Sequence, residues 1–316
     1  MTASRGPVVV ITGASSGIGR SAAHAFARRG YRVVLAARSR ESLVVVAGEC
    51  LRLGAEATIV PTDVSDEAQV QHLARTAVER FGRIDVWVGN ASVFGYGEFE
   101  RIPADVFEGI LRTNLLGQVH GARAVLPQFR RQGAGVLVVV GSLYSKVPSP
   151  LASPYITSKF GTLGFALALR QELRRERDIH VRLVLPATID TPIYQHAANY
   201  TGSSVHPLPP IVSAKRVARA IVKGAERRRR VRVVGRLQGL LIPAYASAPW
   251  LLETFVPRLM PSVALREPQV AAASGTVFEP DPTSNAVSGG WRSAPVRLLA
   301  LGAAGVGATL LLRRRK

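Results

Sequence analysis

The stretch Thr12-Gly13-Ala14-Ser15-Ser16-Gly17-Ile18-Gly19 decides the fold, because of the patterns on either side of it. The apolar run Val8–Thr12 leads into this stretch, and the helical pattern Gly17–Arg29 leaves it. A glycine turn alone also occurs as a plain loop, so its place between a strand and a helix carries the argument. The sequence therefore predicts a strand–turn–helix unit at its beginning.

The three glycines of this turn each have a role in such a unit. Gly13 permits the tight turn, Gly17 lets the backbone approach a pyrophosphate, and Gly19 lets helix and strand pack closely. The N–H groups at the start of the helix are then free to bind phosphates. We predict a dinucleotide site formed here by Gly13, Ser15, Ser16, Gly17, Ile18 and Gly19.

Short apolar runs alternate with longer helical patterns along most of the chain. Strands are predicted at Val8–Thr12, Arg32–Ala37, Ala57–Pro61, Val86–Gly89, Val136–Gly141 and His180–Leu185, with a weaker one at Val231–Val234. Helices are predicted at Gly17–Arg29, Asp66–Phe81, Pro103–Gln132, Ser153–Arg177 and Ser213–Arg227. Apolar strands separated by helices are typical of a parallel sheet covered on both faces. The predicted fold class is α/β, a doubly wound parallel sheet with a C-terminal extension.

The end of the second predicted strand indicates which dinucleotide binds. NAD sites usually place an acidic residue there to hold the ribose hydroxyls, but this strand ends in Ala36-Ala37-Arg38-Ser39-Arg40. An arginine at this place pairs with a 2′-phosphate, and its guanidinium can stack on adenine. The alternative is that Arg38 is a surface residue of an arginine-rich chain. We predict NADP(H), with Arg38 at the 2′-phosphate.

Three side chains suggest proton transfer. Tyr155 and Lys159 lie four residues apart at the start of a predicted helix, so they share one face. A free tyrosine has a pKa of about 10, and a nearby ammonium favours its phenolate. Tyr155 can then exchange a proton with a carbonyl or carbinol oxygen. Ser142 follows the strand Val136–Gly141 at the sheet edge where ligands bind, and it can hold that oxygen. The alternative for Ser142 is a turn or a helix cap.

Taken together, these motifs resemble the short-chain dehydrogenase/reductase family. The matching residues are the glycine turn, Asp63-Val64, Asn90-Ala91, Asn114, Ser142 and Tyr155-Ile156-Thr157-Ser158-Lys159, in the family's order and spacing. The resemblance covers about Val8 to Val234, and the combination is highly specific. It implies a Rossmann-like fold and an NADP(H)-dependent oxidoreductase that moves a hydride between nicotinamide and an alcohol or ketone.

The resemblance also implies roles for individual residues. Tyr155 would be the acid/base and Ser142 would orient the substrate oxygen. Lys159 would hold the nicotinamide ribose, and Asn114 would hold a water that links Lys159 to solvent. The remaining cofactor contacts would be Asp63 and Val64 near the adenine, Asn90 and Ala91 on the ribose side, and Pro186, Thr188, Ile189 and Thr191 at the nicotinamide. The range Thr188–Pro210 would be the substrate lid, and no metal site is predicted.

Two departures from the family pattern bear on the cofactor geometry. The family often has Asn-Asn-Ala-Gly after the fourth strand, where this chain has Gly89-Asn90-Ala91-Ser92, and Pro-Gly after the sixth, where it has Pro186-Ala187. Neither removes a predicted catalytic group. The alternative functions are a non-catalytic NADP(H) sensor or membrane-associated scaffold on the same fold, and epimerisation through a transient ketone.

The C-terminal part of the chain has a different composition. We predict a catalytic domain over 1–260, a Pro-, Ser- and Gly-rich linker over 261–295, and an apolar tail with a basic end over 296–316. The uncharged run Leu298–Leu312 would be a helix about 22 Å long, against roughly 30 Å of hydrocarbon. It can span as an anchor, lie in the interface, or pack on the domain or a partner. We predict membrane attachment, and from it a lipophilic substrate.

Charge and cysteine content limit the other partners. The net charge of +20 comes almost entirely from arginine, and no basic stripe is interleaved with aromatics, so we predict no nucleic-acid partner. The single cysteine, Cys50, fits a reducing, cytoplasmic compartment. The partner expected is a small carbonyl or alcohol substrate. The long helices Pro103–Gln132 and Ser153–Arg177 resemble the family's dimer-forming pair, so a homodimer or tetramer is a further expectation.

Overall fold

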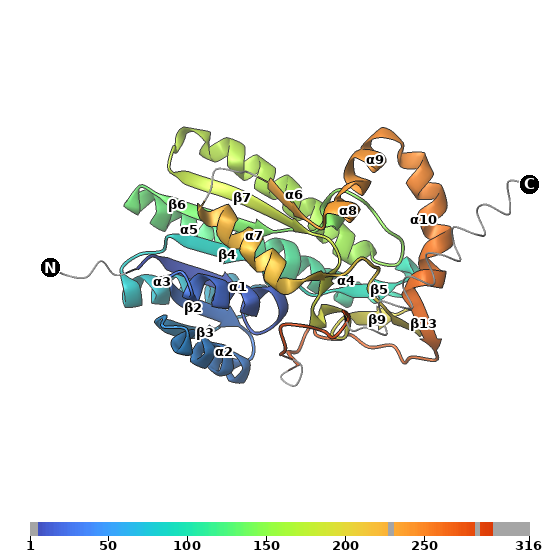
Figure 1. Cartoon of the computed structure of the whole chain (residues 1–316), viewed down its shortest axis with the longest axis horizontal. Helices are drawn as coiled ribbons and strands as arrows, with labels where there is room; N and C mark the ends of the chain where they lie inside the picture. Colours follow the sequence, from blue (N-terminus) through green and yellow to red (C-terminus); the bar gives the residue numbers. More distant parts are fainter. Residues whose placement is uncertain (1–5, 227–230, 282–284, 293–316) are drawn as a thin grey trace, which may run out of the picture.

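A parallel sheet of seven strands forms the centre of the computed structural model, which describes residues 6–226, 231–281 and 285–292 (Figure 1). The strand order is β12-β7-β6-β4-β1-β2-β3. The strands are β1 (Val8–Thr12), β2 (Arg32–Ala37), β3 (Ala57–Pro61), β4 (Val86–Gly89), β6 (Gly135–Val140), β7 (Ile179–Pro186) and β12 (Val231–Val234). The predicted α/β fold is confirmed, and each predicted strand agrees within one residue at either end. The apolar runs determine these strands because both faces of the sheet are buried.

Helices cover both faces of the sheet, and side chains alternate between them. Val9 and Ile11 of β1 face α1 (Gly17–Ala27), α2 (Arg40–Arg52) and α7 (Ala214–Glu226). Val8 and Val10 face the opposite layer, which consists of α3 (Glu67–Phe81), α5 (Gly117–Gln132) and α6 (Ser153–Glu172). Cys50 of α2 is buried in the first of these layers, as its apolar neighbours indicate. The two layers make the fold doubly wound.

The long helix predicted over 103–132 is interrupted. It consists of α4 (Ala104–Leu111), the π-helical segment η2 (Arg112–Leu116) and α5. π-Helical segments are rare and are frequent at functional sites. This one contains Asn114, a predicted site residue, whose side chain is fully buried.

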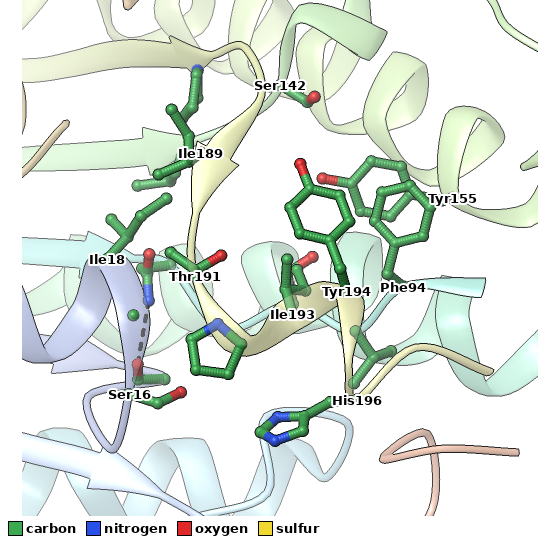
Figure 2. Close-up of a pocket in the computed structure, with 18 of the residues that line it drawn as sticks. Ser16, Ile18, Phe94, Ser142, Tyr155, Ile189, Thr191, Ile193, Tyr194 and His196 are labelled. Carbon is green, nitrogen blue, oxygen red and sulfur yellow. Dashed lines mark hydrogen bonds between the residues drawn. The ribbon is translucent and has the colours of Figure 1, made fainter. Parts of the chain in front are cut away.

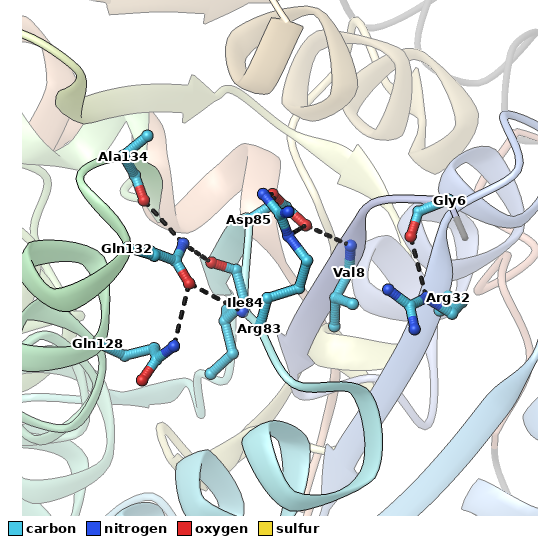
Figure 3. A network of polar contacts seen from close by, with 9 residues as sticks. All are labelled: Gly6, Val8, Arg32, Arg83, Ile84, Asp85, Gln128, Gln132 and Ala134. Atoms are coloured by element: carbon cyan, nitrogen blue, oxygen red, sulfur yellow. Dashed lines mark hydrogen bonds and ion pairs between the residues drawn. The ribbon is translucent and has the colours of Figure 1, made fainter. Parts of the chain in front are cut away.

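Polar contacts close the amino-terminal edge of the sheet (Figure 3). The Asp85 carboxylate accepts a hydrogen bond from the Val8 amide at 2.7 Å, and Arg32 Nε donates to the Gly6 carbonyl at 2.9 Å. Gln132 Nε2 donates to the carbonyls of Ile84 and Ala134. These contacts satisfy main-chain groups where strands begin. The opposite, carboxyl-terminal edge is where ligands bind in such sheets.

Short elements extend this carboxyl-terminal edge. Three two-stranded sheets lie there: β5 (Gly95–Gly97) pairs with β9 (Ala198–Tyr200), β8 (Ile189–Asp190) with β11 (Val212–Ser213), and β10 (Ser203–Val205) with β13 (Leu265–Pro268). The short 3-10 helices are η1 (Phe99–Arg101), η3 (Leu143–Ser145), η4 (Leu173–Arg175) and η5 (Pro192–Tyr194). The predicted lid over 188–210 therefore contains ordered elements.

The C-terminal region differs from the sequence-based expectation. It forms α8 (Arg236–Gly239), α9 (Leu241–Ser247) and α10 (Pro249–Ala264), and α10 crosses the boundary predicted at residue 260 (Figure 1). The stretch expected as a linker forms the end of α10 and β13, and its described residues 269–281 and 285–292 contact the domain. Its contacts join residues far apart in sequence, which periodicity cannot reveal. Within the described ranges no helix is both long and apolar enough to cross a membrane. The apolar tail over 296–316 lies outside those ranges.

Candidate active site

One pocket at the carboxyl-terminal edge of the sheet brings together the predicted site residues. It is lined by Gly13, Ser15, Ser16, Gly17, Ile18, Arg38, Asp63, Val64, Asn90, Ala91, Ser142, Tyr155, Lys159, Pro186, Thr188, Ile189 and Thr191. Of the predicted set, only Gly19 and Asn114 do not line it. Both contact residues that do line it: Gly19 packs against Gly13 and Asn90, and Asn114 bonds Ser92 and Val93. Residues as far apart in sequence as Gly13 and Thr191 thus converge on one cleft.

The glycine turn between β1 and α1 is held by a side chain at the end of β4, the strand that pairs with β1 in the sheet. Asn90 Nδ2, just after β4, donates to the carbonyls of Thr12 at 3.0 Å and Gly13 at 3.2 Å. Gly19 lies so close to this turn that an added Cβ would stand 2.0 Å from the Gly13 carbonyl oxygen. Helix α1 therefore begins against the strand only because residue 19 is glycine. Asn90 positions the turn as well as lining the pocket.

Tyr155 lies near the start of α6 with its ring against that of Phe94. The two centroids are 3.9 Å apart in a stacked arrangement. Figure 2 shows Ser142, Tyr155 and Tyr194 with their hydroxyl groups on the same side of the pocket. Burial raises the pKa of Tyr155 above its usual value, while hydrogen bonds with Ser142 and Ser92 lower it to a smaller extent. The side chain is therefore a protonated phenol near neutral pH, whereas sequence reasoning expected the phenolate to be favoured.

Lys159 is one turn further along α6 and is buried, with only 2% of its surface exposed. Its Nζ donates to the Val140 carbonyl at 3.5 Å and lies 5.3 Å from the centre of the Tyr155 ring. Burial lowers the pKa of Lys159 to about 8. The ammonium thus lies beside the Tyr155 ring, as the four-residue spacing predicts. With a pKa of about 8, it can lose its proton slightly above neutral pH.

Asn114 connects the π-helical segment to the floor of the site. Its Oδ1 accepts hydrogen bonds from the Val93 amide at 2.8 Å and from the Ser92 hydroxyl at 3.0 Å. Its Nδ2 donates to the Val93 carbonyl at 2.9 Å and to Ser158 Oγ at 3.1 Å. The amide therefore links the strand-end segment 92–93 to α6, between Tyr155 and Lys159.

Ser142 is the N-cap of η3 and lies two residues after the end of β6. Its hydroxyl accepts a hydrogen bond from the Tyr144 amide at 3.1 Å, and the Ser145 hydroxyl accepts one from the Ser142 amide, so the pair forms a capping box. The alternative interpretation of Ser142 as a cap is thus correct for its geometry. Ser142 also lines the pocket and lowers the pKa of Tyr155, so it serves both as a cap and as a wall of the pocket.

Sequence reasoning did not identify two residues of the site, Phe94 and Ser92. Phe94 stacks on Tyr155, and Ser92 donates a hydrogen bond to Asn114 and lowers the pKa of Tyr155. Ser92 stands at a position where the family pattern often has glycine, and that departure was the available signal. Phe94 follows the same strand end, but only the fold brings its ring to α6.

Arg38 lies at the end of β2, where the 2′-phosphate contact was predicted. Its guanidinium donates to three main-chain carbonyls of the C-terminal segment: Thr276 at 2.6 Å, Phe278 at 2.9 Å and Val277 at 3.2 Å. A guanidinium has five N–H groups, so these contacts and a phosphate contact are compatible. Arg38 and the C-terminal segment thus border the same end of the pocket.

Comparisons with known proteins match this architecture. Residues 7–200 match the family model for short chain dehydrogenases. An uncharacterised oxidoreductase of Bacillus subtilis is 35% identical over 256 residues, which are 80% of this chain and 72% of that protein. The 2-(R)-hydroxypropyl-CoM dehydrogenase of Xanthobacter autotrophicus is 36% identical over 192 residues, 60% of this chain and 76% of that protein.

Solved structures agree with the sequence matches. A short-chain dehydrogenase/reductase from Burkholderia phymatum in complex with NAD superposes with a TM-score of 0.68 at 26% identity, over 86% of this chain and 100% of that one. An alcohol dehydrogenase from Thermococcus sibiricus complexed with 5-hydroxy-NADP gives 0.61 at 29% identity, over 72% and 94%.

The chain belongs to the short-chain dehydrogenase/reductase family, since the family model covers more than half of it. It is therefore an oxidoreductase whose cofactor is a nicotinamide dinucleotide and whose substrate is a small molecule. The pocket combines the glycine turn, the carboxyl-terminal edge of the sheet and several polar side chains, which are the features that a dinucleotide-dependent oxidoreductase needs.

Proposed function

We propose that this protein transfers a hydride between NADP(H) and an alcohol or ketone, with Tyr155 as the acid/base. The observation that carries the proposal is the convergence of Ser142, Tyr155 and Lys159 on one wall of the pocket, next to the glycine turn. A binding module needs the turn but not this set of proton-exchanging groups. Catalysis therefore explains the arrangement better than a sensor or scaffold on the same fold.

The proton side of the reaction follows from the geometry. A bound nicotinamide supplies or takes the hydride. Ser142 donates a hydrogen bond that orients the substrate oxygen, and the Tyr155 phenol gives its proton to that oxygen in the reductive direction. The raised pKa of Tyr155 suits this direction, because it keeps the donor protonated. Lys159, beside the ring, stabilises the phenolate left behind, and Asn114 supports the relay that returns a proton.

The test of this assignment is the loss of turnover in Tyr155→Phe. NADPH oxidation would be followed by absorbance over a panel of lipophilic ketones and aldehydes. Removing the phenol hydroxyl should lower kcat by roughly 10²–10⁴-fold, the usual contribution of a general acid, with NADPH binding retained. Tyr200→Phe is the matched control, since Tyr200 packs in another apolar cluster and does not line the pocket. Tight NADPH binding without turnover on any compound would favour the sensor.

The choice of NADP(H) rests on Arg38 and on the absence of an acid at the end of β2. Arg38→Ala should weaken NADPH binding by at least about tenfold and NADH binding much less, because only NADPH carries a 2′-phosphate. The ratio of the two dissociation constants is the readout, since any effect on the C-terminal segment acts on both cofactors. Arg40→Ala, on an exposed neighbour, is the control. An unchanged ratio would contradict the assignment.

A lipophilic substrate is proposed from the apolar side of the pocket. Its lining includes Phe94, Leu143, Ile193, Tyr194, Leu241 and Met260. Leu241 and Met260 come from α9 and α10. Large apolar side chains are exposed on α10 and at the junction of α8 and α9: the exposed fractions are 62% for Leu240, 64% for Trp250, 50% for Phe255 and 57% for Leu259. We name these four residues, with Leu237, the α8–α10 surface. We propose that it contacts a lipid bilayer, from which substrate reaches the pocket.

A further inference from the structure

The segment after β13 crosses the mouth of the cofactor pocket. We call the described residues 273–281 and 285–291 the strap. Thr276, Pro280, Asp281 and Asn285 of the strap line the same pocket as the glycine turn, Arg38 and Asp63. The strap is therefore a wall of the predicted dinucleotide site. It also lies beyond the region that the family model matches, residues 7–200.

The first part of the strap is fixed to the lid and to the adenine end of the pocket. Ala273 and Asn199 exchange two main-chain hydrogen bonds, at 2.8 and 3.1 Å, and the Thr276 amide donates to the His196 carbonyl at 2.9 Å. The three carbonyls that follow accept from Arg38, as described above. The Val277 side chain is buried in an apolar cluster with Val93 and Ile110. This part of the strap is thus packed on the domain.

The second part of the strap contacts the start of α1. The Gly17 amide donates to the Ala286 carbonyl at 3.0 Å. Arg20 donates to the Asn285 carbonyl and is itself held by Glu49. The strap thus accepts a hydrogen bond from one N–H group of the glycine turn, and a cavity remains between the strap and the sheet edge.

The end of the strap is fixed by a buried carboxylate next to the nicotinamide end. Asp190, at the end of β8, accepts hydrogen bonds from Ser288 Oγ at 2.7 Å and from the amides of Gly289 at 3.1 Å and Trp291 at 3.0 Å. Trp291 Nε1 donates to the Thr191 carbonyl at 3.1 Å. Asp190 is 5% exposed. A buried carboxylate with three donors is a strong anchor, because each bond is charge-assisted.

We propose that the strap is the movable outer wall of the cofactor site, which closes over bound NADP(H) and must lift before the dinucleotide leaves. The strap joins the adenine end, the glycine turn and the nicotinamide end of one cleft, so a bound dinucleotide lies between it and the sheet edge. Apart from the buried Val277 side chain, its attachments are hydrogen bonds at separate points, and the described residues 269–281 and 285–291 form no helix or strand. Such a segment opens at lower cost than the sheet does. This inference rests on the proposed cofactor.

A matched pair of glycine variants separates the strap from the rest of the site. A Cβ on Gly289 would lie 2.4 Å from the Thr191 carbonyl oxygen, so Gly289→Ala cannot seat the strap on its Asp190 anchor. Gly290 has a φ of 80° with nothing near its Cβ position, and asparagine tolerates that conformation, so Gly290→Asn is the control. Neither glycine lines the pocket.

The experiment measures the dissociation rate of NADPH by stopped-flow fluorescence, with excess NADP⁺ as the displacing ligand, in the full chain. We expect Gly289→Ala to release NADPH at least about tenfold faster and to bind it correspondingly more weakly, with Gly290→Asn within about twofold of wild type. In the wild type, saturating NADPH should slow amide hydrogen exchange in 285–291. This second measurement needs no variant, so it holds even where Gly289→Ala folds poorly.

The opposite results overturn the proposal in distinct ways. An unchanged release rate in a folded Gly289→Ala variant means that the strap does not enclose the cofactor. Tighter binding in that variant, or faster exchange in 285–291 on adding NADPH, means that the strap competes with the dinucleotide. No NADPH binding to the wild type removes the proposed function as well, and NADH titrated in parallel shows whether the cofactor choice alone is wrong.

Discussion

Lys159 is the residue where stability and catalysis conflict most clearly. The side chain is buried, and burial alone lowers its pKa from 10.5 to about 8. The folded chain therefore binds this proton less tightly than the unfolded chain does. The cost of the buried charge is fully present below pH 8, and it disappears as the pH rises from about 8 to 10.5. The proposed role of Lys159 in stabilising a phenolate accounts for a buried ammonium that costs stability.

Lys159→Met should consequently be more stable than the wild type at pH 7, by roughly 1–3 kcal/mol, while losing turnover. The stability gap should narrow as the pH approaches 10.5. Urea unfolding at pH 7 and pH 10 measures the stability gap and its dependence on pH. The control is Lys215→Met, a substitution of an exposed lysine of α7. A destabilised Lys159→Met with a gap independent of pH would show that the ammonium is held by favourable contacts instead.

At the scale of elements, the strands were predictable and the interruptions were not. β1, β2, β3, β4 and β12 coincide with their predicted ranges because runs of buried β-branched residues determine them locally. The π-helical segment contains Asn114, whose partners lie 21 and 44 residues away in sequence. The strap depends on Arg38, whose acceptors lie at least 238 residues away. The glycine turn, Ser142, Tyr155 and Lys159 were predictable because short motifs carry them.

Asn114 gives the π-helical segment a testable role. Asn114→Ala leaves the Val93 amide and carbonyl buried without a partner, so it should lower stability by about 2–3 kcal/mol. Arg112→Ala, an exposed residue of the same segment that pairs with Glu108, should change stability by less than about 0.5 kcal/mol. Thermal unfolding distinguishes the two. Equal, small effects would show that the segment does not depend on the amide.

At the scale of the whole molecule, the chain combines the apolar α8–α10 surface with a strong positive net charge. Exposed aromatic and aliphatic side chains on α9 and α10, together with a net charge of +20, favour a surface of anionic lipid. Two residues from these same helices, Leu241 and Met260, line the pocket. If the proposed membrane contact holds, a lipophilic substrate has a short path from the bilayer to Tyr155.

Vesicle sedimentation tests this placement. The full chain should bind phosphatidylglycerol vesicles more tightly than phosphatidylcholine vesicles. The double variant Trp250→Ser/Phe255→Ser should bind at least about tenfold more weakly, because two aromatic side chains no longer enter the interface. Val44→Ser/Val45→Ser removes exposed apolar side chains of α2 and is the matched control. Equal binding by both double variants would place the contact elsewhere in the chain.

The transfer of deuterium from 4-deuterated NADPH to a ketone product, detected by mass spectrometry, tests the central claim most directly. Hydride transfer on this site predicts one deuterium on the carbinol carbon from only one of the two C4-deuterated epimers of NADPH, and labelled product formed roughly 10²–10⁴-fold more slowly with Tyr155→Phe. Product without the label from both epimers, or label that appears equally fast with Tyr155→Phe, would contradict the assignment of Tyr155 and its neighbours as the groups that carry out the reaction.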